Sequence, residues 1–218
     1  MANPDIKAVL WDFGGVLTTS PFDSFRAYEA ENGLPEGAIR QLNATNPDHN
    51  AWARFERGEV TVEEFAKLFE REASDAGHTL DATALLSTLS GELRPGMVEA
   101  LRRCHARLKT GLLTNNFSAG EDNLSVQEAG RVTAGYAPVM DLFDAVVQSS
   151  IAGCRKPDPR FYRIALDLLG IEPEHAVFLD DLGVNLKPAR QMGMITIKVV
   201  DPDLAIQELE EVVGFPLS

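Results

Sequence analysis

Side chains that can bind a divalent cation and a phosphoryl group follow several short apolar runs and turns of this sequence. They are Asp12, Thr114, Asn115, Lys156, Asp180 and Asp181. Carboxylates from two segments, together with a backbone carbonyl, make the hard oxygen site that suits Mg²⁺. A carboxylate beside such a cation can attack phosphorus and form an aspartyl-phosphate, while lysine and threonine suit the non-bridging phosphoryl oxygens. Zinc is disfavoured because Asp12 has no His or Cys partner at metal-ligand spacing.

A second interpretation assigns the same residues to local structure. An aspartate before two glycines, as at Asp12, can cap a turn. The Asp180-Asp181 pair can cap the helix that follows it, and Lys156 can be a solvated side chain in a proline-rich turn. The Thr114 hydroxyl can bond to its own backbone. The order of the surrounding elements decides between the two interpretations.

Apolar runs of strand length alternate with helical patterns along most of the chain. Strands are expected at 6–11, 111–116, 145–147, 176–179 and 195–200. Helices are expected at 97–108, 159–169, 187–192 and 203–213. This alternation predicts an α/β fold, a doubly wound parallel sheet with helices on both faces. Because parallel strands end at the same edge of a sheet, the polar side chains are expected to converge there.

Residues 18–92 carry helical patterns and no convincing strand. Helices are expected at 22–32, 35–42, 49–57, from 61 onward and at 81–90. Thr61 and Glu64 have the spacing of a capping box, which marks the start of one of them. The segment is therefore predicted to be an α-helical cap inserted after the first strand. Residues 1–17 and 93–218 then form a Rossmann-like core.

Two other parts of the sequence receive no role in the chemistry. Trp52, Arg54 and Arg57 are interpreted as part of an amphipathic helix with a solvated arginine face, rather than as substrate contacts. The stretch 118–136 is polar and rich in glycine, and it predicts no particular element.

The composition excludes several classes of partner. The net charge of the 218 residues is −13, so neither nucleic acid nor an anionic membrane, which need a basic footprint, is an expected partner. The same charge disfavours long-range steering of an anionic substrate, so a phosphorylated one needs a local cation. Cys104 and Cys154 lack C-x-x-C spacing and are expected to be reduced thiols of a cytoplasmic protein. No apolar run approaches the length of a membrane span, and no signal-peptide pattern is present.

The strand ends together carry a family resemblance. Four segments follow one another as the four motifs of the haloacid dehalogenase-like (HAD) hydrolase superfamily do: Asp12-Phe13-Gly14-Gly15-Val16, Leu112-Leu113-Thr114-Asn115, Lys156-Pro157-Asp158 and Phe178-Leu179-Asp180-Asp181. The chain resembles that superfamily over its whole length, the helical insert included. The stretch 177–190 is similar to the N-terminal phosphatase domain of soluble epoxide hydrolase, and residues 12–16 are similar to HAD domains fused to acyl-CoA dehydrogenases.

The resemblance implies a Mg²⁺-dependent hydrolase, a phosphatase of a small phosphorylated metabolite, with a Rossmann-like core and a helical cap. By the same resemblance, Asp12 is the nucleophile and a metal ligand, and Lys156 is catalytic. The Asp181 carboxylate and the Gly14 carbonyl complete the implied metal site. The implied phosphate-binding residues are Thr114, Asn115, Gly15 and Lys156, with Asp180 as a supporting carboxylate.

Gly14 departs from the family pattern. Most phosphatases that the chain resembles carry a second aspartate two residues after the nucleophile, as general acid and base, and here that position is Gly14. Such help is typically worth about 10²–10⁴ in rate. Three interpretations stay open: a substrate with a good leaving group, another proton donor, or a protein that binds phosphate-bearing ligands and turns over poorly. A haloacid dehalogenase, which would use Asp12 on carbon without metal, is a further alternative that Asp181 disfavours.

Overall fold

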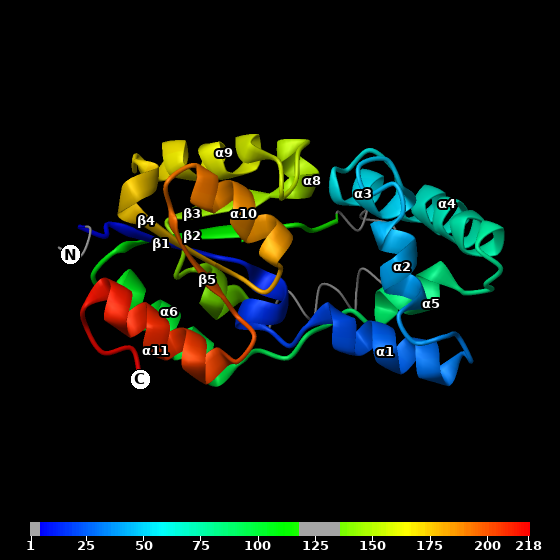
Figure 1. Ribbon diagram of the computed structural model, residues 1–218, viewed down its shortest axis with the longest axis horizontal. Helices are drawn as coiled ribbons and strands as arrows, with labels where there is room; N and C mark the ends of the chain where they lie inside the picture. Colours follow the sequence, from blue (N-terminus) through cyan, green and yellow to red (C-terminus); the bar gives the residue numbers. More distant parts are fainter. Residues whose placement is uncertain (1–4, 118–135) are drawn as a thin grey trace.

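A computed structural model describes residues 5–117 and 136–218, and its centre is one parallel sheet (Figure 1). Within these residues the five strands run in the order β3-β2-β1-β4-β5. Their bounds are β1 Ala8–Trp11, β2 Lys109–Thr114, β3 Ala145–Gln148, β4 Ala176–Asp180 and β5 Ile195–Lys198. All four pairings between neighbouring strands are parallel. The predicted doubly wound α/β fold is confirmed.

The central strand β1 is buried on both faces because its side chains alternate between two hydrophobic clusters. Val9 and Trp11 pack with helices α6 (Pro95–His105) and α11 (Pro202–Val213). Ala8 and Leu10 pack on the other face with α9 (Pro159–Leu169) and α10 (Gly183–Gln191). In Figure 1, α9 and α10 lie above the sheet and α6 and α11 below it. This double burial explains why β1 is a continuous apolar run rather than an alternating one.

Several short elements differ from the sequence-based expectation. The expected helix at 187–192 is wrong in its start, because α10 begins at Gly183 and holds Pro188 in its interior. A proline usually marks a helix start, and here the helix tolerates it within. The one-turn helix α8 (Ser149–Ala152) follows β3 directly, and the turn Phe13–Leu17 follows β1. Both are too short to leave a periodic pattern. The stretch 118–135, which predicts no element, lies outside the described residues.

Helices α1 to α5 form a second packing unit at one end of the sheet (Figure 1). Their bounds are α1 Pro21–Glu31, α2 Ala38–Ala44, α3 Ala51–Glu56, α4 Val62–Asp75 and α5 Ala82–Ser87. Their buried side chains form a hydrophobic cluster of their own, with Phe55, Phe65 and Phe69 stacked in it. The capping box at Thr61 and Glu64 is present.

The two chain segments that join this unit to the sheet lie side by side. Thr18 and Leu93 form an isolated antiparallel bridge, and the Thr19 amide donates to the Glu92 carbonyl at 2.9 Å. The chain therefore leaves the core after β1 and returns to it next to the point of departure.

Two further observations concern the chain as a whole. In the part of the chain that the structure describes, no helix combines the length and the apolar character needed to cross a lipid bilayer. Cys104 and Cys154 are both buried and free.

Truncating Phe65 is expected to loosen α1–α5 while leaving the sheet intact. Phe65 is fully buried in the cluster of these helices, and removing such a ring costs about 3–5 kcal/mol. In hydrogen exchange, Phe65→Ala should raise the exchange of α1–α5 amides more than that of β1 and β4 amides. Phe161→Ala, the matched change on α9, should raise exchange in the sheet. Equal increases in both units for both variants would contradict two separate packing units.

Candidate active site

Strand register brings the predicted residues to one edge of the sheet. Trp11, the last residue of β1, pairs with Leu112 of β2 and with Leu179 of β4. The next residue, Asp12, therefore lies level with Asp180, and its amide donates to the Leu179 carbonyl at 2.9 Å. The carboxyl ends of the two central strands meet here, as the sequence predicts.

The Lys156 ammonium lies between the carboxylates of Asp12 and Asp180. Its Nζ atom is 2.7 Å from Asp12 Oδ1 and 2.8 Å from Asp180 Oδ2. The Lys156 side chain is 1% exposed, so its charge must be paired inside the protein. Lys156 comes from the loop after β3, which means that three segments distant in sequence converge on one ammonium group.

Asp180 is engaged by its protein neighbours on both oxygens. Its Oδ1 accepts from the Leu182 amide at 2.8 Å, and the Asn185 side chain donates to both oxygens at 3.0 and 3.1 Å. Asp180 thus fixes Lys156 and the start of α10 together, as a supporting carboxylate. Asn185 is a contributor that sequence reasoning missed. Its position shortly after the Asp180-Asp181 pair, in the first turn of a helix, was the available signal.

Three carboxylates at this edge could hold a metal ion. Asp12, Asp180 and Asp181 each offer an oxygen, and these atoms lie within 4.8 Å of one another. Lys156 supplies one positive charge against three negative ones, so the cluster has the excess negative charge that a divalent cation would neutralise. Among the described residues, protein groups bond both oxygens of Asp180 but only Oδ1 of Asp12, so Asp12 and Asp181 are the carboxylates left for a cation. The donor set fits a hard divalent ion.

Burial and mutual repulsion shift the protonation of this cluster. Burial raises the pKa of Asp12 well above its ordinary value, and Lys156 opposes that shift. Burial, followed by the charge of Asp180, raises the pKa of Asp181 to about 6. Burial also lowers the pKa of Lys156, but the charges of Asp12 and Asp180 outweigh it and the net pKa of the lysine is raised. The lysine is therefore a fixed positive charge at neutral pH.

The two glycines after Asp12 have different environments. Gly15 has φ +79°, and a Cβ atom there would lie 2.3 Å from Asp181 Oδ2. A side chain at Gly15 would therefore displace the Asp181 carboxylate. Gly14 has φ −68°, and a Cβ atom would meet only Pro21, at 3.6 Å, among the residues described. The absent side chain at Gly14 is thus a matter of chemistry and not of space.

The predicted phosphate-binding residues lie at the same edge but make different contacts. Thr114 ends β2, half-buried and paired with Gln148 of β3. The Asn115 side chain holds the backbone of Lys156: its Oδ1 accepts from the Lys156 amide at 2.9 Å and its Nδ2 donates to the Lys156 carbonyl at 3.1 Å. The Gly15 amide donates to the Thr19 carbonyl at 3.3 Å. Binding of phosphate by these three residues stays a prediction.

The helical unit contributes to this edge a residue that sequence reasoning missed. Glu56, at the end of α3, accepts from Arg155 at 2.7 Å and from Asn115 at 3.4 Å. No local pattern distinguishes this glutamate from the others of the helical unit. Trp52 packs against Phe25 and Phe65, and the Arg54 side chain is 40% exposed, as the amphipathic interpretation expects. The Arg57 side chain is only 17% exposed and pairs with Glu59, so it does not belong to a solvated face.

Comparison with known proteins supplies the family context of this geometry. The family model described as haloacid dehalogenase-like hydrolase matches residues 6–193. The chain is 38% identical to acyl-CoA dehydrogenase family member 10 of Mus musculus over 97% of its own length, but it spans only 19% of that relative. It is 31% identical to bifunctional epoxide hydrolase 2 of Sus scrofa, covering 97% of this chain and 40% of the relative. Both named resemblances are confirmed, and the chain spans well under two thirds of either relative.

Two further similarities involve proteins of comparable length. A protein named as a phosphatase in Mycobacterium tuberculosis is 32% identical, with 87% of this chain and 85% of the relative covered. Among solved structures, an HAD family enzyme of Bacteroides thetaiotaomicron in complex with magnesium and inorganic phosphate superposes with a TM-score of 0.60 at 18% identity, over 88% of this chain and 93% of that chain. At that identity the structural likeness concerns the fold.

Alanine at the two glycines is expected to have opposite consequences. Gly14→Ala fits a backbone that alanine adopts readily and should leave thermal stability unchanged or slightly higher, by about 0.4–1 kcal/mol. Gly15→Ala forces a positive φ, which costs roughly 1–2 kcal/mol, and pushes on the Asp181 carboxylate. Thermal unfolding and Mg²⁺ titration of both variants measure the difference. Equal cation affinity in wild type and Gly15→Ala would contradict the expectation that a side chain at this position displaces a metal ligand.

The raised pKa of Asp181 predicts two opposite pH dependences. Since this pKa is about 6 in the folded protein and about 3.9 in an unfolded chain, the folded state binds more protons between these values. The free energy of unfolding of metal-free wild type, relative to Asp181→Asn, is therefore expected to increase from about pH 7 to about pH 5. Affinity for a divalent cation should fall over the same range, because the ligand must be ionised. Denaturation curves and cation titrations test both signs, and a relative stability that does not change with pH would contradict the first.

Proposed function

Because the chain belongs to the haloacid dehalogenase-like hydrolase family, we propose that it is a Mg²⁺-dependent phosphatase of a small phosphorylated metabolite. The observation that carries this proposal is the Lys156 ammonium between Asp12 and Asp180, with an oxygen of Asp181 within 4.8 Å of an oxygen of each of these carboxylates. The relative from Mycobacterium tuberculosis that is named as a phosphatase supports it, since the chain covers 85% of that protein.

Asp12 is the proposed nucleophile. Its Oδ1 is held by Lys156 at 2.7 Å and by the Phe13 amide at 2.7 Å, which leaves Oδ2 for attack on phosphorus. The new bond joins Oδ2 to phosphorus while the bond from phosphorus to the leaving oxygen breaks, giving an aspartyl-phosphate and a leaving oxygen anion, which takes a proton from solvent to become an alcohol or remains a carboxylate. Water then attacks the phosphorus of this intermediate, releases inorganic phosphate and restores the Asp12 carboxylate.

The surrounding residues lower the barrier by charge and position. Lys156 places a fixed positive charge beside the nucleophile, where the phosphoryl oxygens would gather. Bound by Asp12, Asp181 and the Gly14 carbonyl, Mg²⁺ would supply further positive charge that offsets the repulsion between carboxylate and phosphate. We propose that the Thr114 hydroxyl, the Asn115 side chain and the Gly15 backbone complete the phosphate site.

Residues 18–92 are proposed to act as the cap of this site, inserted into a core of residues 1–17 and 93–218. The separate hydrophobic cluster of α1–α5 supports such a division. A cap over the sheet edge would exclude water and contact the part of the substrate beyond the phosphate.

We propose that the protein is located in the cytoplasm, since its two free, buried cysteines suit a reducing compartment.

A second candidate function follows from Gly14. Position 14 therefore lacks the carboxyl group that would protonate the leaving oxygen and activate water in most phosphatases of the family. The alternative is a protein that binds phosphate-bearing ligands and hydrolyses them slowly. The room beside Gly14, with Pro21 the nearest described neighbour at 3.6 Å, makes Gly14→Asp a test of this alternative.

Asp12→Asn is expected to abolish phosphate release. Wild type and variant would be compared on acetyl phosphate and on an alkyl phosphate, each with and without Mg²⁺. Acetyl phosphate needs little protonation of its leaving group, so it bypasses the missing acid. Loss of the nucleophile should reduce the wild-type rate on the order of 10³-fold or more, while circular dichroism confirms the fold. Full activity of Asp12→Asn would contradict the mechanism.

Gly14→Asp separates the two candidate functions in the same assay. If the native site lacks an acid, the variant should hydrolyse the alkyl phosphate faster by about 10²–10⁴-fold, with little effect on acetyl phosphate. Wild-type protein that binds inorganic phosphate in the presence of Mg²⁺ but hydrolyses neither substrate would support the binding function instead.

A further inference from the structure

We propose that Glu56 is a positioning residue for Lys156, which it holds through Arg155 and Asn115. Seating of the helical unit on the core then completes the site, because α3 supplies this carboxylate. The expected effect on catalysis rests on the proposed function, whereas the positioning of the Lys156 backbone by Glu56 does not.

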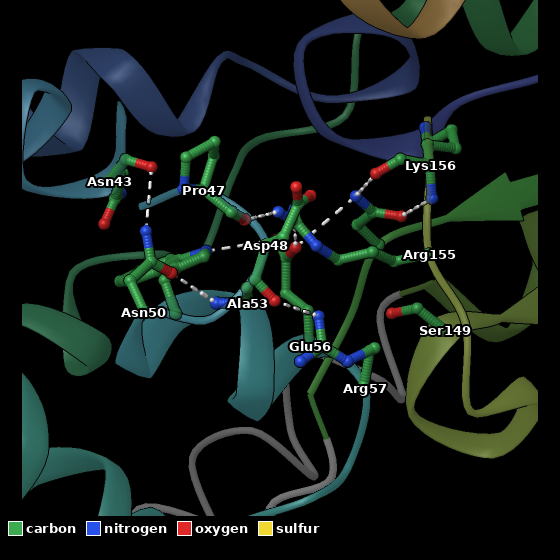
Figure 2. A network of polar contacts seen from close by, with 12 residues as sticks. Asn43, Pro47, Asp48, Asn50, Ala53, Glu56, Arg57, Ser149, Arg155 and Lys156 are labelled. Atoms are coloured by element: carbon green, nitrogen blue, oxygen red, sulfur yellow. Dashed lines mark hydrogen bonds and ion pairs between the residues drawn. The ribbon is translucent and has the colours of Figure 1, made fainter. Parts of the chain in front are cut away.

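Glu56 joins the two units through a small set of charged and polar contacts (Figure 2). Its Oε2 lies 2.7 Å from an Arg155 guanidinium nitrogen and 3.4 Å from Asn115 Nδ2. Its Oε1 accepts from the Trp52 indole at 3.1 Å. The side chains of Glu56 and Arg155 are only 13% and 19% exposed, so this ion pair is shielded from water.

Both routes from Glu56 end on the backbone of Lys156. Arg155 is its neighbour in the chain, so fixing the Arg155 side chain restrains the peptide that precedes Lys156. Asn115 bonds to the amide and to the carbonyl of Lys156 at 2.9 and 3.1 Å. The Lys156 ammonium can bridge Asp12 and Asp180 only if the backbone that carries its side chain is held in place. These contacts hold that backbone.

The ion pair favours the seated arrangement of the helical unit. Burial raises the pKa of Glu56, and Arg155 opposes the shift, as expected for a carboxylate that depends on its partner for compensation. Removing one member of a buried pair leaves the other charge uncompensated. Withdrawal of α3 from the core would do the same to both residues, so separation of the units is disfavoured.

Other contacts at the end of α3 show that the approach is close. Phe55 stacks on Phe117, which follows β2, with ring centroids 4.8 Å apart. Gly58 lies against α8, where a Cβ atom would come within 2.6 Å of the Ser150 carbonyl. A second Arg155 nitrogen donates to the Pro47 carbonyl at 2.5 Å. Glu56 and Arg155 thus supply the ion pair of an interface that apolar and backbone contacts also form.

The test compares Glu56→Gln, Arg155→Met and the double variant with wild type. Glu59→Gln is the matched control, since Glu59 is a carboxylate of the same unit that pairs with Arg57 and Arg54 within it. Two readouts are measured for each protein. One is kcat and KM for Mg²⁺-dependent hydrolysis of acetyl phosphate, and the other is hydrogen exchange of the Lys156 amide, whose bond to Asn115 reports directly on the lysine backbone.

Glu56→Gln and Arg155→Met are each expected to lower kcat by about 3- to 100-fold, the range of coupling between residues in one network. The effect on KM should be smaller. The double variant should lower kcat by less than the product of the two single effects, because both single variants remove the ion pair between Glu56 and Arg155. The Lys156 amide should exchange faster in all three, while Glu59→Gln behaves as wild type. Partial recovery of kcat in Arg155→Lys would support the role of charge.

Wild-type kcat together with wild-type exchange at Lys156 in Glu56→Gln would overturn the inference while leaving the phosphatase proposal intact. Exchange that rises as much in α4 as at Lys156 would also overturn it, because Glu56 would then only stabilise the helical unit. If the wild type hydrolyses nothing, the proposed function fails. The exchange measurement then still decides whether Glu56 positions Lys156.

Discussion

The contact of the Lys156 ammonium with Asp12 and Asp180 is the constraint on which the rest of this structure depends. The two carboxylates come from β1 and β4, which are neighbours at the centre of the sheet, and without a cation between them they would repel each other. Since a buried charge must be paired, the loop after β3 has to bring the lysine back across β2 to this point. The strand order and the loop path are therefore both tied to one nitrogen atom.

The two adjacent aspartates at the end of β4 divide structural and chemical work between them. Asp180 is fully buried and bonded by Lys156 and Asn185, so it shapes the site from beneath. Asp181 is partly exposed, and burial with repulsion from Asp180 raises its pKa, so it gains most from a cation. Gly15 permits the close approach of the β1 turn to Asp181. The negative charge of Asp180 thus makes the binding of a metal ion by its neighbour Asp181 more favourable.

The sequence could predict the sheet and the convergence of the polar side chains, because both follow from local patterns. Each strand is an apolar run, and parallel strands end at one edge, so Asp12 and Asp180 could be assigned to that edge, whereas the pairing of β1 with β4 comes from the structure. Contacts between distant residues left no such pattern. Glu56 and Arg155 pair across the two units, and no sequence pattern near either residue predicts this pair. The family resemblance assigns Asn115 to phosphate, but no local pattern indicated that its side-chain amide also bonds to the Lys156 backbone.

The bridge between Thr18 and Leu93 has a consequence for how this architecture can diversify. The chain leaves the core and returns to it at adjacent points, so the helical unit is equivalent to a loop whose two ends are held together. The entropic cost of closing such a loop grows only slowly with its length. The helices can therefore be lengthened, shortened or replaced as a unit without changing the order of the strands. Such a replacement must preserve the interface at the end of α3, because the Glu56 carboxylate there pairs with Arg155 in the loop that carries Lys156.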